Sequence, residues 1–189
     1  MVGRVWFQEL IGARRRLAGR PVRDKELAAT VRELLDRQSI ADCIRRYARG
    51  VDRFDDALVA SAYHLDAVED HGPVRGSPRE FIAWYRSQQP PRSATLHCVA
   101  NQMIELHGNE ANAETYFFSL VRYEDGADAT LVFGRYVDHL TRRDGEWRIA
   151  SRILVREGRL TAHDASEGMP NAIGRRDRSD VSYKRTRTP

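Results

Sequence analysis

The sequence predicts an α+β protein, with helices in the first half of the chain and antiparallel strands in the second. Two observations carry this prediction: apolar residues recur at helical spacing up to about residue 89, and four segments of alternating apolar and polar residues follow. Helices followed by a run of strands are typical of α+β folds rather than of βαβ sheets. The chain has 189 residues, 41% hydrophobic and 31% charged, which is enough for one domain with a full core.

The longest helical pattern covers residues 24–53. With a turn of about 100° per residue, Ile44 and Val51 fall at the centre of an apolar face. Tyr47 and Asp52 lie at the two edges of that face, while arginines occupy the opposite side. A buried carboxylate needs a partner, so Asp52 is a candidate site residue. The alternatives are that Asp52 reaches water at the helix end and that Tyr47 belongs to the core.

Two shorter helices are expected at residues 55–64 and 77–89, separated by a short strand and turn at 65–76. The second of them should begin with a capping box, because Ser77 precedes Pro78 and Glu80 follows at the third helical position. Two prolines at 90–91 should end it.

Four strands are expected at about residues 93–107, 110–124, 128–143 and 146–157, joined by the turn signals "HGNE", "EDGAD" and "RRDGEW". The alternating pattern ends after residue 157. The chain therefore divides into a basic N-terminal extension at 1–25, with room for a short helix, a folded domain at 26–158 and a basic, flexible tail at 159–189.

Charge and composition narrow the class of protein. The net charge of +4 comes from the ends, since residues 1–25 carry +5 and residues 172–189 carry +4, which leaves −5 for the middle. A nucleic-acid-binding fold should carry its basic residues on the folded surface, so this distribution argues against one. There is neither an apolar run of about 20 residues nor a signal peptide, and we expect a cytoplasmic protein with no membrane span. Cys43 and Cys98 are expected to be small buried residues.

His97 is the second candidate site residue. On an extended strand it shares a face with Val99 and Asn101, and such a mixture of polar and apolar side chains suits the lining of a pocket. The alternative is an ordinary half-buried strand histidine. His71 lies at the end of the short strand, where it could belong to a turn or to a pocket wall. No HExxH, CxxC, GxGxxG, P-loop or GxSxG motif is present, so the sequence predicts neither a metal site nor a nucleotide cofactor.

The order of elements and five segments, "YARGVDRFD", "DHGPVRGSPREFIAWY", "LHCVANQMIEL", "AETYF" and "GRYVDHLTRRDGEWRIASR", resemble the SnoaL-like branch of the nuclear transport factor 2-like superfamily over about residues 30–157. The resemblance implies a cone-shaped, curved antiparallel sheet wrapped on three helices, an α+β barrel with an internal apolar cavity. This branch includes dehydratases, a dehydrochlorinase, polyketide cyclases and ketosteroid isomerase-like enzymes.

The resemblance also implies roles for residues. Asp52 would orient His97 as a general base, and Tyr47 matches a polar position five residues before that aspartate. The residues that would contact substrate are His71, Val99, Asn101, Tyr116 and Arg152. The implied activity is a lyase or isomerase without cofactor, most readily a dehydratase, that acts on a small hydrophobic cyclic substrate such as a steroid or polyketide. The alternative is a non-catalytic ligand-binding or assembly subunit of the same fold. Apolar residues on the outer sheet face, among them Phe117, Phe118 and Phe133, further predict a homodimer or homotrimer.

Overall fold

The computed structural model describes residues 24–88, 91–124, 128–163 and 174–184. The chain forms two compact units, Met1–Asp36 and Arg37–Pro189. The short helix expected within residues 1–25 lies outside the described residues. The candidate site lies entirely within the second unit, which is therefore the one that matters for function.

The α-helices of the described residues lie where the sequence pattern predicts them, whereas a short 3-10 helix lies in the segment expected to be a flexible tail. The helices are α2 (Asp24–Asp52), α3 (Asp56–Ser61), α4 (Pro78–Ser87) and the short 3-10 helix η1 (Val181–Tyr183). The predicted capping box of α4 is present, because the Ser77 hydroxyl accepts a hydrogen bond from the Glu80 N–H and the Glu80 carboxylate accepts one from the Ser77 N–H. This cap fixes the point at which α4 begins and thus the placement of its aromatic side chains.

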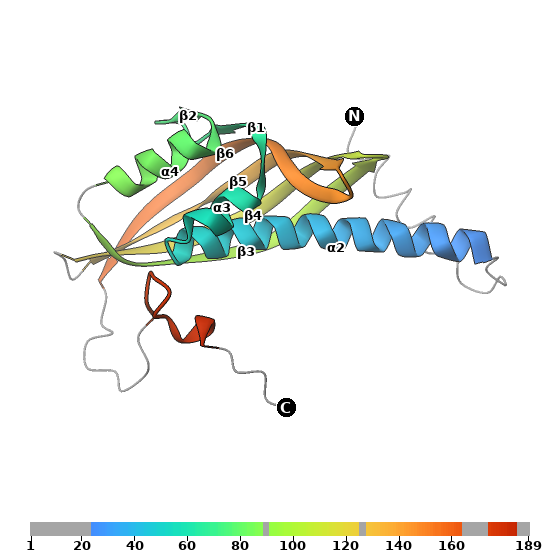
Figure 1. Ribbon diagram of the computed structural model, residues 1–189. Helices are drawn as coiled ribbons and strands as arrows, with labels where there is room; N and C mark the ends of the chain where they lie inside the picture. The colour runs from blue at the N-terminus through green and yellow to red at the C-terminus, as the bar shows by residue number, and fades with distance from the viewer. Residues whose placement is uncertain (1–23, 89–90, 125–127, 164–173, 185–189) are drawn as a thin grey trace. The chain divides into compact units, whose positions relative to one another are not determined.

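The strands form one six-stranded sheet (Figure 1). They are β1 (Tyr63–Asp70), β2 (Arg75–Gly76), β3 (Arg92–His107), β4 (Glu110–Tyr123), β5 (Asp128–Arg143) and β6 (Glu146–His163), in the order β2-β1-β6-β5-β4-β3. The α+β prediction is confirmed. The expected antiparallel sheet is mixed, however, because β1 pairs with β6 in parallel. That pairing joins strands far apart in the sequence, which no local turn signal records.

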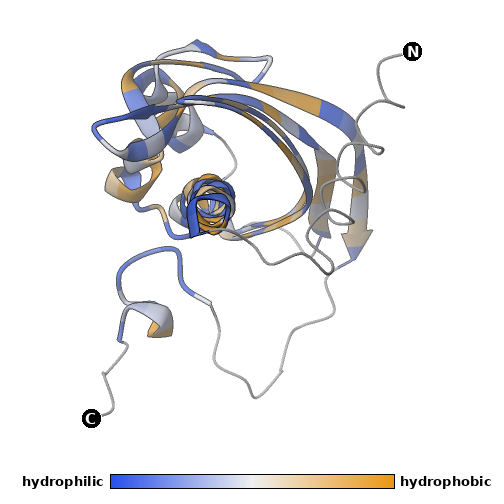
Figure 2. Ribbon diagram, turned by 90° about the vertical axis from the view of Figure 1, so that its right-hand side faces the viewer, coloured by the Kyte–Doolittle hydropathy of each residue, from blue (hydrophilic) through white to orange (hydrophobic). Residues whose placement is uncertain are grey.

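The sheet is an open arc rather than a closed barrel. Strands β2 and β3 are its two edges and do not pair with each other, and Figure 2 shows the curved, unclosed outline. The hydrophobic core fills the concave side, where the end of α2 meets the sheet; it includes Ile40, Ile44, Tyr47, Val51, Phe81, Tyr136, Leu140, Trp147 and Ile149. The apolar face predicted for this helix is therefore the buried one.

Two β-bulges reverse which residues of a strand face the interior. In β3 the register shifts at Asn101, whose φ of 36° lies in the left-handed region. Before the bulge Thr95 is buried and Leu96 exposed, whereas after it Ile104 packs on the core and Met103 is exposed. In β6 a register shift beside Ala150 has the same effect. Each bulge adds one residue and bends the strand, which helps the sheet to curve.

Candidate active site

The end of α2 places Asp52 at the edge of the core. Phe54 has a φ of 50°, and its N–H donates to Val51 O while the N–H of Asp55 donates to Gly50 O. These two bonds form a Schellman motif with a phenylalanine, rather than the usual glycine, in the left-handed position. Asp52 is the last residue of the helix, only 7% exposed, and sits where the helix dipole disfavours an anion. Its carboxylate therefore requires compensating donors.

His97 supplies both of those donors. Its Nδ1 lies 2.6 Å from Asp52 Oδ1, and its backbone N–H donates to Asp52 Oδ2 at 2.9 Å. The Asp52 carboxylate thus accepts two hydrogen bonds from one residue of β3. The same contacts fix the orientation of the His97 ring. Because a carboxylate only accepts, Nδ1 must carry a proton and donate it. In the neutral ring this leaves Nε2 with a free lone pair, which is the form that can accept a proton.

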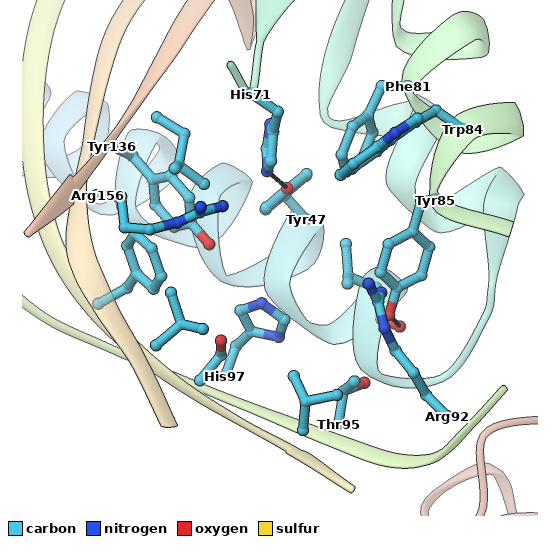
Figure 3. A pocket seen from close by; sticks show the side chains of 16 residues that line it. Tyr47, His71, Phe81, Trp84, Tyr85, Arg92, Thr95, His97, Tyr136 and Arg156 are labelled. Carbon is cyan, nitrogen blue, oxygen red and sulfur yellow. Dashed lines mark hydrogen bonds between the residues drawn. The ribbon is translucent and has the colours of Figure 1, made fainter. Parts of the chain in front are cut away.

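A pocket of about 120 Å³ opens beside this pair. It is lined by Tyr47, Val51, His71, Phe81, Trp84, Tyr85, Arg92, Thr95, His97, Phe117, Ser119, Val121, Val132, Tyr136, Leu154 and Arg156. Figure 3 shows the His97 ring projecting into it from β3, with His71 and Tyr47 on the opposite side. Most of the wall is apolar or aromatic, so a ligand there would leave water behind.

A second histidine faces the same pocket and also has a carboxylate neighbour. His71 Nδ1 lies 2.5 Å from Oε1 of Glu69, which is 1% exposed. His71 Nε2 lies 3.5 Å from the Tyr47 hydroxyl, and the Tyr63 hydroxyl donates to the other oxygen of Glu69. Burial raises the pKa of Tyr47 well above its usual value. Tyr47 therefore keeps its proton and remains a hydrogen-bond donor toward the pocket.

A buried ion pair lies behind Tyr47. Arg152 donates from Nε to Asp138 Oδ1 at 2.6 Å and from Nη2 to Asp138 Oδ2 at 2.7 Å, and both side chains are 0% exposed. The guanidinium also stacks 4.3 Å from the Tyr47 ring and 4.1 Å from the Tyr136 ring. Arg152 therefore supports the tyrosines from behind and does not line the pocket.

Four of the five residues expected to contact substrate lie elsewhere; only His71 lines the pocket. Val99 packs against the core without lining the pocket. Asn101 is exposed at the β3 bulge, and Tyr116 is 46% exposed because alternation along β4 turns Thr115 and Phe117 inward instead. Val99, Asn101, Tyr116 and Arg152 are therefore not among the lining residues of this pocket. Cys98 is exposed as well, against expectation, because it alternates with His97.

The sequence reasoning missed several pocket residues. Thr95 and Ser119 place hydroxyls beside the histidine, since Thr95 is two residues before His97 on the same face and Ser119 pairs directly across from it. Alternation from His97 would have found Thr95. Arg92 and Arg156 bring guanidinium groups to the pocket, and the bulge in β6 is the reason that Arg156 could not be placed from alternation alone.

Part of the basic tail is packed. Arg176 donates to Val51 O at 3.4 Å and to Tyr85 Oη, and its guanidinium stacks 3.5 Å from the Phe54 ring. The Asp180 carboxylate accepts hydrogen bonds from the Ser182 hydroxyl and the Arg175 N–H, which lower its pKa well below the usual range. Residues 174–184 thus differ from the flexible tail expected from composition, and they contact the helix end that carries Asp52.

The fold is an open, curved α+β sheet that encloses a pocket, and the Asp52–His97 pair lies at the wall of this pocket. These features place the protein among α+β folds with an internal cavity. Residues 32–153 match the model of the SnoaL-like domain, and the chain belongs to this family. No helix among the described residues is long and apolar enough to cross a membrane. The same residues bring together no group of three side chains suited to hold a metal ion.

Solved structures share this fold. A candidate scytalone dehydratase from Novosphingobium aromaticivorans is 19% identical, with a TM-score of 0.65 over 76% of this chain and 99% of that one. A type 2 hexachlorocyclohexane dehydrochlorinase, LinA, is 21% identical, with a TM-score of 0.67 over 74% and 99%. The type 3 enzyme from Novosphingobium barchaimii is 19% identical, with a TM-score of 0.64 over 76% and 99%. A comparison with curated protein sequences gave no match. At these identities the likeness establishes the fold.

Proposed function

We propose that the protein is a cofactor-independent lyase, most readily a dehydratase, that uses Asp52 and His97 to remove a proton from a small cyclic substrate. The observation that carries this proposal is the 2.6 Å contact between Asp52 Oδ1 and His97 Nδ1 at the wall of an apolar pocket. An isomerase would begin with the same proton transfer. The solved dehydratase-like and dehydrochlorinase neighbours of this fold are compatible with it.

The tautomer of His97 with its proton on Nδ1 is the one that can abstract a proton from the substrate. Because Asp52 accepts from His97 Nδ1, the Nε2 lone pair is free to take a proton from a carbon atom adjacent to an activating group. The imidazolium that forms is stabilised by the carboxylate, whose position the His97 N–H also fixes. General-base catalysis of this kind contributes a rate factor of about 10²–10⁴.

The leaving group needs a proton on the other side of the substrate. Tyr47 is the candidate donor because it lines the pocket and its hydroxyl lies 3.5 Å from His71 Nε2, which can stabilise the phenolate that forms. In a dehydration, the C–H proton passes to His97, the C–O bond breaks, and the departing hydroxyl takes a proton from Tyr47 to leave as water. The imidazolium form of His71, beside the Glu69 carboxylate, would give its Nε2 proton to Tyr47. After product release, His97 would lose its proton to water and His71 would regain one from water.

The experiment that tests this proposal separates proton abstraction from the later steps. Hydroxylated cyclic ketones would be incubated with the protein in D₂O, and deuterium uptake next to the carbonyl would be followed by NMR. We expect uptake with the wild type, a loss of about 10²–10⁴-fold in Asp52→Asn and loss to background in His97→Ala. His139→Ala, which changes a half-buried histidine of β5 outside the pocket, is the matched control. Uptake that survives in His97→Ala would exclude this base.

A further inference from the structure

Two arginine side chains line the pocket, in addition to the two histidines that contact the carboxylates of Asp52 and Glu69. Arg92 and Arg156 are among the lining residues, whereas no aspartate or glutamate of the described segments is. Neither guanidinium forms an ion pair with any described carboxylate. We propose that the substrate is an anion, a single hydrophobic ring that bears a carboxylate, and that Arg156 binds this carboxylate. The inference rests on the proposed function only in placing the substrate in the same pocket.

Arg156 lies beside a register shift within β6. It pairs with Gly134 at the register shift between β5 and β6, where a Cβ on Gly134 would meet Val155 O at 2.1 Å. The strands thus approach so closely that only glycine fits opposite Arg156. Figure 3 shows the guanidinium extending into the pocket beside Tyr136. A planar guanidinium can hold a carboxylate by two parallel hydrogen bonds, which makes arginine well suited to this role.

Arg92 adds charge to the opposite side of the pocket. Its guanidinium stacks 4.6 Å from the Tyr85 ring, and its Nε is buried without a hydrogen-bond partner among the described residues. Arg176 lies nearby, since it donates to Arg92 O and Tyr85 Oη. Burial lowers the pKa of Arg176, and the like charge of Arg92 lowers it further. An anion in the pocket would offset this repulsion between cations.

The size and walls of the pocket limit the rest of the ligand. A dry cavity of about 150 Å³ is known to hold one benzene ring, and this pocket has a volume of about 120 Å³. A steroid would therefore not fit inside without movement of the walls, whereas a single ring is close to the size of the pocket. The walls supply six aromatic side chains for contact with that ring: Tyr47, Phe81, Trp84, Tyr85, Phe117 and Tyr136. The carboxylate would then lie toward Arg156.

Benzoate and benzamide test the proposal without knowledge of the natural substrate, because they share shape and differ in charge. Binding to the full chain would be measured by titration calorimetry at low salt. We expect benzoate to bind about 10–100-fold more tightly than benzamide, the difference made by charged hydrogen bonds. Added NaCl should weaken only benzoate. Arg156→Gln should abolish the preference, while Arg159→Gln, which removes an equal charge from β6 outside the pocket, should retain it.

The outcomes are distinct. Equal binding of the two probes, or a preference that survives in Arg156→Gln, would overturn the proposal, provided circular dichroism shows that the variant is folded. Acetate binding as tightly as benzoate would overturn the assignment of a ring. His97→Ala should keep the benzoate preference, because the base does not contact the carboxylate in this arrangement. The deuterium-uptake experiment tests the base, and the comparison of benzoate with benzamide tests the anion site. Either proposal can therefore fail without the other.

Discussion

Removal of the buried carboxylate behind the pocket should cost more stability than any other single change at the site. In Asp138→Ala the guanidinium of Arg152 would lose both of its hydrogen bonds, at 2.6 and 2.7 Å, in a position that is 0% exposed. Arginine cannot lose its proton to escape burial. Its Nη1 already has no hydrogen-bond partner among the described residues, so no second contact can compensate.

The expected loss is about 3–5 kcal/mol, as for other buried ion pairs broken from one side. For a chain of this size each kcal/mol lowers Tm by about 2–4 °C, so Tm should fall by roughly 6–20 °C. Arg152→Met should cost less, because a carboxyl group can become neutral. Burial already raises the pKa of Asp138, and loss of Arg152 removes the strongest influence that lowers it.

Urea unfolding at two pH values provides the assay. In Arg152→Met the folded-state pKa of Asp138 exceeds its unfolded value of about 3.9. The contribution of protonated Asp138 to stability is thus complete below about pH 3.9, the unfolded pKa, and is lost as the pH rises through the folded pKa. When the pH is lowered from 7 to 5, Arg152→Met should therefore gain stability relative to wild type. The double variant Asp138→Val/Arg152→Met should recover most of the loss. A loss below about 1 kcal/mol in Asp138→Ala, or a double variant no more stable than the single one, would refute this reasoning.

Three other predictions concern the tail, its pH dependence and assembly. Ending the chain at residue 173 removes the Arg176 contacts with Val51 and Tyr85, and should lower the free energy of unfolding by about 1–3 kcal/mol, measured by urea titration. Hydrogen bonds lower the pKa of Asp180, so the unfolded state binds more protons than the folded state below about pH 4. Asp180→Asn should therefore be less stable than wild type at pH 7. The difference in unfolding free energy between the two proteins should shrink as the pH is lowered. Phe118 and Phe133, paired on the outer sheet face and 49% and 37% exposed, should support self-association; a light-scattering mass of 21.7 kDa at micromolar concentration would contradict it.

Local patterns in the sequence were sufficient for most of the fold. The capping box of α4 and the hairpin turns between β3 and β6 depend on neighbouring residues, and such signals are visible in one sequence. Asp52 could be singled out because a carboxylate on an apolar helix face requires a partner. Its pairing with His97 was implied by the family resemblance. The parallel pairing of β1 with β6 could not be predicted, since it depends on tertiary packing.

The remaining errors in the site trace to register. Asn101 interrupts the alternation of β3 with a φ of 36°, and nothing in the hydrophobic pattern marks that position. Asparagine does tolerate the left-handed region better than most residues, which is the one signal that could have been used. Phe117 was placed on the outer face but lines the pocket, and Arg156 was overlooked. A one-residue shift moves every later side chain to the other face.

The contact between Arg176 and the end of α2 joins two parts of the chain that are made at different times during synthesis. Arg176 is 125 positions beyond Val51, whose carbonyl it caps next to Asp52. On the ribosome, the helix, His97 and all six strands are made before Arg176 exists. A nascent or prematurely terminated chain could therefore form the sheet and close the hydrophobic core while Phe54 and the helix end still lack their last partner. The site residues are made early, but their support is completed only once Arg176 has been made.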